Sequence, residues 1–307
     1  EAGLELGFWK GRLNLSASYY LNRSGNQLVG LPLPLMTGQS SVQFNLPAVV
    51  ENKGLELMIN TRNIDKARFG WTTSVNFTLP KNKLLEFPSI EKFPAYQAKY
   101  DVGNSIFTYK GYEFGGVNPE TGYYQVINQN EDNQFNALDY VGLKLKAQQY
   151  YGGISNTLRL GSVEVDFLFQ FVKQKGFAYQ QSFGYPGTIS NQPDIVMQRW
   201  QQAGDVTGIQ RFAATDPTSA AIIAYYRQVS SDNIIQDASF IRLKNASVSW
   251  TFPKPWLTKT KLQQARIFIQ GQNLLTFTDY IGLDPETQNS VVVPPLRMIT
   301  AGVHVSL

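Results

Sequence analysis

Histidine and cysteine are the residues that most often build catalytic and metal sites, and this sequence of 307 residues contains one histidine and no cysteine. A single histidine leaves little basis for a Ser-His-Asp triad or a histidine-based metal site, and disulfides and cysteine-based sites are excluded. We therefore expect no catalytic residue, no metal site and no cofactor. His304 itself is expected to be a polar wall residue of a strand.

Carboxylates offer a second route to chemistry. The sequence contains two similar tetrapeptides, Asn-Pro-Glu-Thr at 118–121 and Asp-Pro-Glu-Thr at 284–287. They could be acid sites or calcium ligands, but Asx-Pro sequences favour turns, so we predict a turn at each. A glycosidase would need two loop carboxylates, such as Asp205 and Asp216, to converge within roughly 5 to 9 Å, and no motif supports that pairing.

The composition excludes several classes of protein. Charged residues make up 16% of the chain and aromatic residues 13%, whereas roughly 25% charged residues is usual. The 43% of hydrophobic residues is enough to bury a core, which excludes a disordered chain. No segment approaches the ~20 apolar residues of a transmembrane helix, which excludes a helical membrane protein. The net charge of +4 comes without a basic stripe, so no nucleic-acid partner is expected.

Apolar side chains recur at every second position along much of the sequence, which predicts β-strands. These strands would position the polar and charged residues discussed above. In 12–22, for example, Leu13 and Leu15 alternate with Asn14 and Ser16. We predict strands at 3–9, 11–23, 50–62, 68–79, 149–160, 162–174, 234–252, 262–277 and 296–307, with boundary errors of a few residues.

The links between these strands alternate in length. Residues 10–11, 63–67, 161 and 253–261 form short links, whereas 24–49, 80–148, 175–233 and 278–295 form long ones. This asymmetry is typical of an outer-membrane β-barrel with short periplasmic turns and long extracellular loops. Aromatic residues near the strand ends fit membrane girdles. A soluble β-rich protein with a core of aromatic residues is the alternative, since its strands would also alternate.

The barrel interpretation assigns each strand face to lipid or lumen. The predicted lipid-facing residues are Leu13, Leu15, Val165, Phe167, Val248, Trp250, Val303 and Val305. The predicted lumen-facing residues are Asn14, Ser16, Asn60, Glu164, Asp166, Arg266 and His304.

Nine strands do not close a bacterial barrel, which has an even number of strands, and an open sheet would leave unpaired edges in hydrocarbon. We therefore expect other polypeptide to supply the missing strands. On this hypothesis the fold class is all-β, and residues 1–307 are the C-terminal part of one larger barrel domain. The absence of an initiator methionine indicates either a processed product or a piece of a longer protein, and we expect the second.

We expect the long loops to carry the function. Residues 175–233 combine aromatic rings with arginines, which suit a protein partner, packing between loops, or a sugar or peptide substrate. The candidates for partner or substrate contact are Tyr185, Arg199, Trp200, Tyr225 and Tyr226. Residues 194–202 are expected to form one short surface helix begun by Asp194.

Several segments resemble one family. Residues 50–56, 238–245 leading to Trp250, and 271–278 followed by 282–286 resemble the C-terminal half of SusC/RagA-like TonB-dependent transporters of Bacteroidetes-type outer membranes. Residues 111–122 and 150–156 are also similar to family segments, so the resemblance covers nearly the whole chain. The motif residues, which we expect to be structural, are Asn52, Gly54, Glu56, Phe240, Arg242, Leu243, Asn245, Gly271, Gln272, Asn273, Leu274, Asp284 and Pro285.

The resemblance implies a 22-stranded barrel in outer-membrane lipid, a plug inside it, and a SusD-like surface lipoprotein as its lid. It also implies energy from the TonB system, whose coupling box, like the plug, the family places upstream of this segment. Family members usually end on an aromatic residue, whereas this chain ends on Leu307, which puts in doubt that the true C-terminus is present.

The functional hypothesis is a segment of an active importer of oligosaccharides or oligopeptides. Two alternatives stay open. One is a barrel that serves as an anchor or subunit of a secretion or surface-assembly complex. The other is a soluble β-rich carbohydrate-binding protein or glycosidase. Sugars and peptides are recognised by the same aromatic and polar groups, so the sequence does not identify the substrate.

Overall fold

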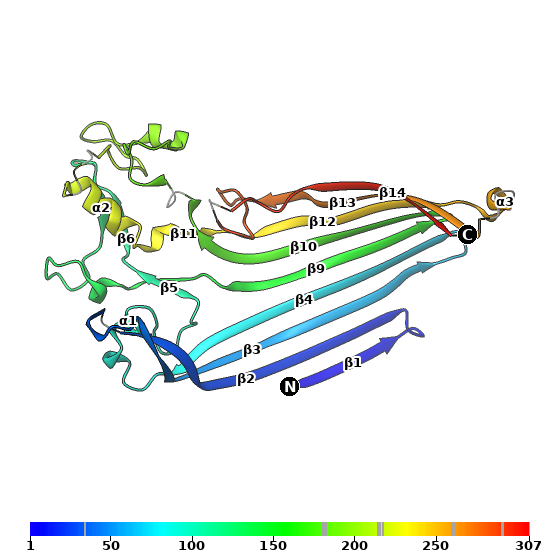
Figure 1. Ribbon diagram of the computed structural model, residues 1–307, viewed down its shortest axis with the longest axis horizontal. Helices are drawn as coiled ribbons and strands as arrows, with labels where there is room; N and C mark the ends of the chain where they lie inside the picture. The colour runs from blue at the N-terminus through cyan, green and yellow to red at the C-terminus, as the bar shows by residue number, and fades with distance from the viewer. Residues whose placement is uncertain are drawn as a thin grey trace.

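The computed structural model describes residues 1–33, 35–179, 183–213, 216, 218–258, 262–289 and 292–306. Its main body is one antiparallel sheet with the strand order β1-β2-β3-β4-β9-β10-β12-β13-β14, and the short β11 pairs with β10 (Figure 1). The bounds are Ala2–Phe8 (β1), Leu13–Pro32 (β2), Ser41–Asp65 (β3), Phe69–Glu86 (β4), Gln148–Leu160 (β9), Val163–Phe177 (β10), Ile235–Asp237 (β11), Phe240–Thr251 (β12), Gln264–Thr278 (β13) and Met298–Ser306 (β14).

Short and long connections lie at opposite ends of this sheet (Figure 1). The short-turn end contains the connections 9–12, 66–68, 161–162 and 252–263, the last with α3 (Lys254–Leu257). The long-loop end contains the connections 33–40, 87–147, 178–234 and 279–297. Its elements are α1 (Pro94–Gln97), β5 (Thr108–Gly111), β6 (Phe114–Val117), β7 (Tyr124–Val126), β8 (Gly142–Leu145) and α2 (Ala220–Gln228). The predicted nine long strands and their two-ended arrangement are confirmed.

Several predicted boundaries are wrong. The predicted loop 24–49 is mostly strand, because β2 and β3 keep pairing beyond a bulge at Asn26 and leave only 33–40 as the connection. The predicted strand 234–252 is two strands, β11 and β12, which both pair with β10. The predicted helix 194–202 is a 3-10 helix over Asp194–Gln198, and the nine-residue α2, begun by the Ser219 cap, was not predicted. Leu307 lies outside the described residues.

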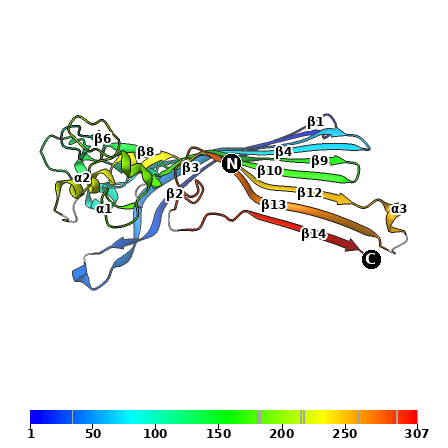
Figure 2. The same ribbon diagram turned by 90° about the horizontal axis from the view of Figure 1, so that it is seen from above.

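The sheet is a single layer, as Figure 2 shows from above. The register aligns the apolar positions into rows, such as Leu15 opposite Ile59 and Val75 opposite Ile154. This face stays uncovered: Ile269 is 60% exposed and Val303 67%. Within the described part of the chain, the other sheets are the two-stranded pairs β5–β8 and β6–β7, so no second layer makes a sandwich.

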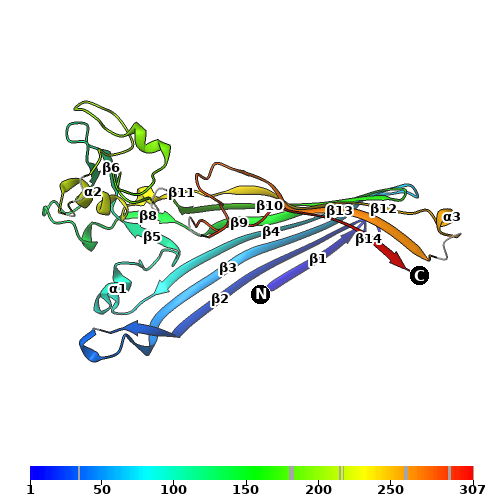
Figure 3. The same ribbon diagram turned by 45° about the horizontal axis from the view of Figure 1, so that its top comes forward.

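Buried hydrophobic clusters lie at the long-loop end instead. One contains Ala48, Leu84 and Phe87 and packs against the α1 region, and the other contains Ala213 and Ile222. β1 and β14 form the two edges of the sheet (Figure 3). No helix among the described residues is both long and apolar enough to cross a membrane.

Candidate functional site

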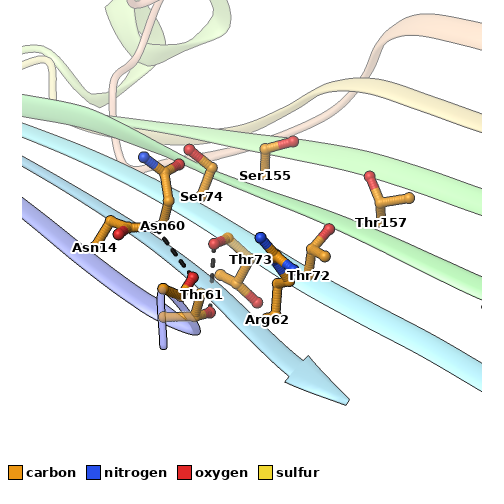
Figure 4. A pocket seen from close by; sticks show the side chains of 10 residues that line it. Asn14, Asn60, Thr61, Arg62, Thr72, Thr73, Ser74, Ser155 and Thr157 are labelled. Carbon is orange, nitrogen blue, oxygen red and sulfur yellow. Dashed lines mark hydrogen bonds between the residues drawn. The ribbon is translucent and has the colours of Figure 1, made fainter. Parts of the chain in front are cut away.

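The polar face of the sheet is the first candidate surface. Asp166 on β10 accepts hydrogen bonds from Thr157 Oγ1 on β9 at 2.6 Å and from Ser247 Oγ on β12 at 3.2 Å. Nearer β2, hydroxyl and amide side chains together with the Arg62 side chain line a shallow pocket of about 210 Å³ (Figure 4). The lining includes Asn14, Asn60, Ser74, Ser155 and Thr157. A surface of this kind can hydrogen-bond neutral polar groups that pass or rest against it.

The register brings the predicted face residues together in two sets. Asn14 lies opposite Asn60, and Arg266 opposite His304. Arg266 Nη2 also approaches Glu164 Oε1 at 3.8 Å. All seven predicted lumen-facing residues share this face, and all eight predicted lipid-facing residues share the other. Their assignment to lumen and lipid stays a prediction.

A bulge in β12 explains the family-like motif 238–245. Phe169 pairs with Leu243, whereas the preceding residue of β10 pairs with Asn245, so Lys244 is the extra residue. One extra residue reverses which side chains face which way. Continuing the alternation back from Trp250 without the bulge would place Arg242 on the apolar face, but with it Arg242 lies on the polar face.

Arg242 forms a buried ionic cluster with the 279–297 loop. Its side chain is 1% exposed, and its Nη2 lies 2.5 Å from Asp284 Oδ2 and its Nη1 2.6 Å from Glu286 Oε2. Its Nε donates to Thr276 Oγ1 on β13 at 3.0 Å. Lys244 Nζ reaches the same Glu286 oxygen at 3.4 Å. The cluster ties two strands to one loop, a role that the sequence analysis missed although the break in alternation signalled it.

Both predicted Asx-Pro turns form. Asp284 Oδ1 accepts from the backbone N–H groups of Glu286 and Thr287 at 2.9 and 3.1 Å. Asn118 Oδ1 accepts from Glu120 and Thr121 at 2.8 and 3.0 Å. The same local hydrogen bonds therefore build two turns at the long-loop end.

Each turn also offers its proline carbonyl to a distant side chain. Gln174 Nε2 donates to Pro285 O at 2.8 Å, and Trp200 Nε1 donates to Pro119 O at 2.8 Å. We call the first the wall-tied turn (284–287), because Gln174 belongs to β10, and the second the loop-tied turn (118–121). Neither tie was predicted.

The other motif residues have structural contacts. Asn52 Oδ1 accepts from Asn82 Nδ2 at 2.6 Å, and Asn82 Oδ1 accepts from the Ile106 N–H at 2.9 Å, which holds the loop after α1. A Cβ atom on Gly54 would lie 2.6 Å from the Tyr20 hydroxyl, so glycine makes room for that ring.

The motif 271–274 lies opposite the bulge, where Gln272 pairs with Asn245. Asn273 has φ +52°, a left-handed conformation that asparagine tolerates, and its Nδ2 donates to Leu296 O at 3.1 Å. A Cβ on Gly271 would meet the Leu274 side chain at 2.6 Å. Phe240 is buried beneath the Arg242 guanidinium, 5.1 Å from its ring centre. Glu56 lies opposite Ser18 and Thr78 on the polar face.

The long loops pack largely on each other. We call the described residues of the loops 87–147 and 178–234, which are joined by hydrogen bonds such as Trp200 to Pro119, the loop unit. Trp200 and Tyr225 are each 8% exposed, so in this structure they are packed inside the loop unit and do not form a free contact surface. Arg199 stacks on Phe212, and Tyr185 packs against the Ala213 cluster. Tyr226 is 59% exposed. A role of these residues in partner or substrate contact stays a prediction.

A pocket of about 270 Å³ opens inside this loop unit. Its lining includes Tyr124, Phe183, Gln198, Tyr225 and Gln228, and no charged side chain among the described residues. Burial raises the pKa of Tyr124 to about 12, so its hydroxyl stays neutral at physiological pH. The pocket is at the small end of ligand sites, which usually measure ~300–1,000 Å³, and its chemistry suits a neutral group.

The loop carboxylates Asp205 and Asp216 each accept local hydrogen bonds from their own turns. Asp205 accepts from the Gln201 and Gln202 N–H groups, and Asp216 from Thr218. These hydrogen bonds lower the pKa of each carboxyl, whereas a general acid needs a raised one. His304 is exposed, and the described residues contain no group of three or more histidine, cysteine or acidic residues placed to hold a metal ion.

Comparisons with known proteins agree with this architecture. TonB-dependent receptor P3 of Formosa agariphila is 29% identical over 93% of this chain and 30% of its own length. TonB-dependent receptor SusC of Bacteroides thetaiotaomicron is 23% identical over 96% of this chain and 30% of its own length. The chain thus spans about 30% of the length of the curated relatives it matches.

The fold is also similar to that of solved structures. A chain in "Structure of the RagAB peptide transporter" matches 99% of this chain with a TM-score of 0.79 at 19% identity, and the match covers 34% of that chain. The "closed-closed" state of the RagAB peptide importer gives a TM-score of 0.74.

The family model that matches residues 1–274 is described as TonB dependent receptor-like, beta-barrel. This match excludes the soluble β-rich alternative and agrees with the expectation that the chain is not an enzyme. The chain therefore belongs to the TonB-dependent receptor-like β-barrel family, as a SusC/RagA-like segment of a bacterial outer-membrane protein.

Proposed function

We propose that this chain is a wall-and-loop segment of an active outer-membrane importer of oligosaccharides or oligopeptides. The observation that carries the proposal is the uncovered sheet with one apolar and one polar face. Lipid would cover the apolar face, and the polar face would line the lumen around a plug. The rest of the receptor would supply the remaining strands, the plug and the TonB contact.

The long loops support a role in capturing a substrate outside the cell. Their pocket is lined by tyrosine rings and amides, which can stack on and hydrogen-bond a sugar ring or a peptide backbone. The solved RagAB structures are described as those of a peptide transporter, which favours a peptide, whereas the uncharged lining accepts either class. A SusD-like lipoprotein would cover these loops as a lid, and exposed Tyr226 is a candidate contact.

Deletion of the receptor gene and affinity purification of the intact receptor test this proposal. We expect the deletion to abolish growth on one class of oligosaccharide or oligopeptide, and a SusD-like lipoprotein to copurify from detergent-solubilised outer membranes. Wild-type growth on every oligomer tested, together with stoichiometric copurification of secretion machinery, would contradict import and favour an anchoring role.

A further inference from the structure

The short-turn end is strongly basic. Its four connections, 9–12, 66–68, 161–162 and 252–263, contain no aspartate or glutamate. Five of their basic side chains lie in the described residues and are exposed, and these are Lys10, Arg12, Lys66, Arg68 and Lys254. Acidic residues begin in the strands beside these connections, with Asp65 at the end of β3 and Glu164 near the start of β10.

These five cations lack acidic partners among the described residues, in contrast to several of the cations at the other end of the sheet. Among the described residues, no ion pair includes any of the five, and Arg12 donates instead to the backbone carbonyls of Arg62 and Asn63. At the long-loop end, some of the lysines are paired, as in Lys53–Glu51 at 3.0 Å and Lys110–Asp101 at 2.8 Å. The short-turn end therefore presents positive charge that nothing in the described chain neutralises.

Exposed tryptophans accompany these charges. Trp9, next to Lys10, is 73% exposed, and Trp256, two residues after Lys254, is 61% exposed. Trp9 and Lys10 have φ values of +50° and +57°, a costly conformation for large side chains. The turn thus holds an exposed ring and a cation in place at the expense of backbone strain.

Tryptophan beside lysine or arginine is the combination favoured at the boundary between hydrocarbon and headgroups. Indole rings settle at the headgroup level, and each basic side chain near the surface attracts anionic lipid. We propose that the short-turn end binds the headgroups of anionic phospholipids in the leaflet next to it. This inference goes beyond the import proposal and does not depend on it, since a receptor of any function would meet the same leaflet.

Lipid binding to the intact receptor tests this inference. The receptor in detergent is titrated with phosphatidylglycerol or with phosphatidylcholine, and bound lipids are counted by native mass spectrometry. The test variant carries Lys10→Gln, Lys66→Gln and Lys254→Gln. The control carries Lys83→Gln, Lys92→Gln and Lys99→Gln, which remove the same charge from exposed positions at the long-loop end.

We expect wild type and control to prefer phosphatidylglycerol, and the test variant to bind it more weakly by on the order of a hundredfold, from roughly fivefold per lysine. Heat-modifiability on gels checks that each variant folds. Equal losses in both triple variants, or no loss in either, would overturn the proposal. The same variants are also titrated with soluble peptidoglycan fragments. If the test variant loses binding to these fragments while its phosphatidylglycerol binding is unchanged, the proposal is overturned, because the partner would then be a polymer.

Discussion

The wall-tied and loop-tied turns have nearly the same sequence, Asp-Pro-Glu-Thr and Asn-Pro-Glu-Thr, and the same local hydrogen bonds. Their surroundings differ. Asp284 meets a buried arginine of the sheet, whereas Asn118 belongs to a turn that packs under Trp200 in the loop unit. The local sequence therefore determines the turn, whereas the partner that each turn binds depends on distant residues.

Replacing Arg242 with methionine should give the largest effect, and only at the wall-tied turn. It leaves buried Asp284 without its cation, and breaking a buried ion pair costs about 3–5 kcal/mol. Urea unfolding of the intact receptor in vesicles measures the loss of free energy of unfolding. Hydrogen exchange of residues 279–289 shows whether the loss is located at the wall-tied turn. Lys244→Met is the control, because its half-exposed pair with Glu286 is worth under about 1 kcal/mol. If Arg242→Met and Lys244→Met lowered the free energy of unfolding equally, the result would contradict a buried ionic cluster at Arg242.

Gly122→Ala should damage the loop-tied turn and spare the other. A Cβ there would lie 2.4 Å from the Trp200 ring, and φ is +73°. Overpacking and the left-handed backbone together cost about 2–4 kcal/mol. Gly38→Ala is the matched control, because Gly38 has the same φ with nothing within 4 Å. Hydrogen exchange of residues 118–124 should rise only in Gly122→Ala, and equal effects on that segment would show that Trp200 does not press on the turn.

Exchanging the Asx residues of the two turns tests whether the charge of Asp284 stabilises only the wall-tied turn. Asp284→Asn keeps the turn but removes the charge that faces Arg242, which should lower the free energy of unfolding by about 2 kcal/mol. Asn118→Asp keeps an acceptor in an exposed turn and should change stability by less than about 0.5 kcal/mol. Urea unfolding of both variants of the intact receptor measures the difference, and equal costs would show that the wall-tied turn gains nothing from its charge.

The smallest expected effect is a loss of stability of the loop unit at alkaline pH. The pKa of Tyr124 is about 12 in the folded state, above its unfolded value near 10, so its contribution is complete below pH 10 and falls as pH rises towards 12. We expect the loop unit to lose about 1 kcal/mol of stability at pH 11. Hydrogen exchange of residues 118–128 at pH 8 and 11, corrected for intrinsic rates, measures it. Tyr124→Phe should reduce the pH dependence and leave the part that belongs to Tyr225, whose pKa burial also raises, and an unchanged dependence would assign it to another group.

Much of the sheet could be predicted from alternation, because each strand has one apolar and one polar face and the turns at one end of the sheet are short. The extension of β2 and β3 past Asn26 could not, since glycine and asparagine there are typical of a loop, and the bulge that carries pairing through them depends on both strands. Both Asx turns were predictable for the opposite reason, because their hydrogen bonds lie within four residues.

The site was predictable only in part. Alternation grouped Asn14 with Asn60 and Glu164 with Arg266. The acidic partners of Arg242, in contrast, lie more than forty residues away and are reached through a bulge. The burial of Trp200 and Tyr225 depends on how two long loops pack together, which no local pattern reveals.

Spin-label accessibility along β10 in the intact receptor tests the central claim, that one face of this sheet meets lipid and the other water. The chain has no cysteine, so single cysteines at each position from 163 to 168 can be labelled in a cysteine-free receptor. We predict oxygen accessibility at Val163, Val165 and Phe167, and accessibility to a water-soluble nickel chelate at Glu164 and Asp166. Accessibility without a two-residue period, or with the two sets reversed, would contradict the claim.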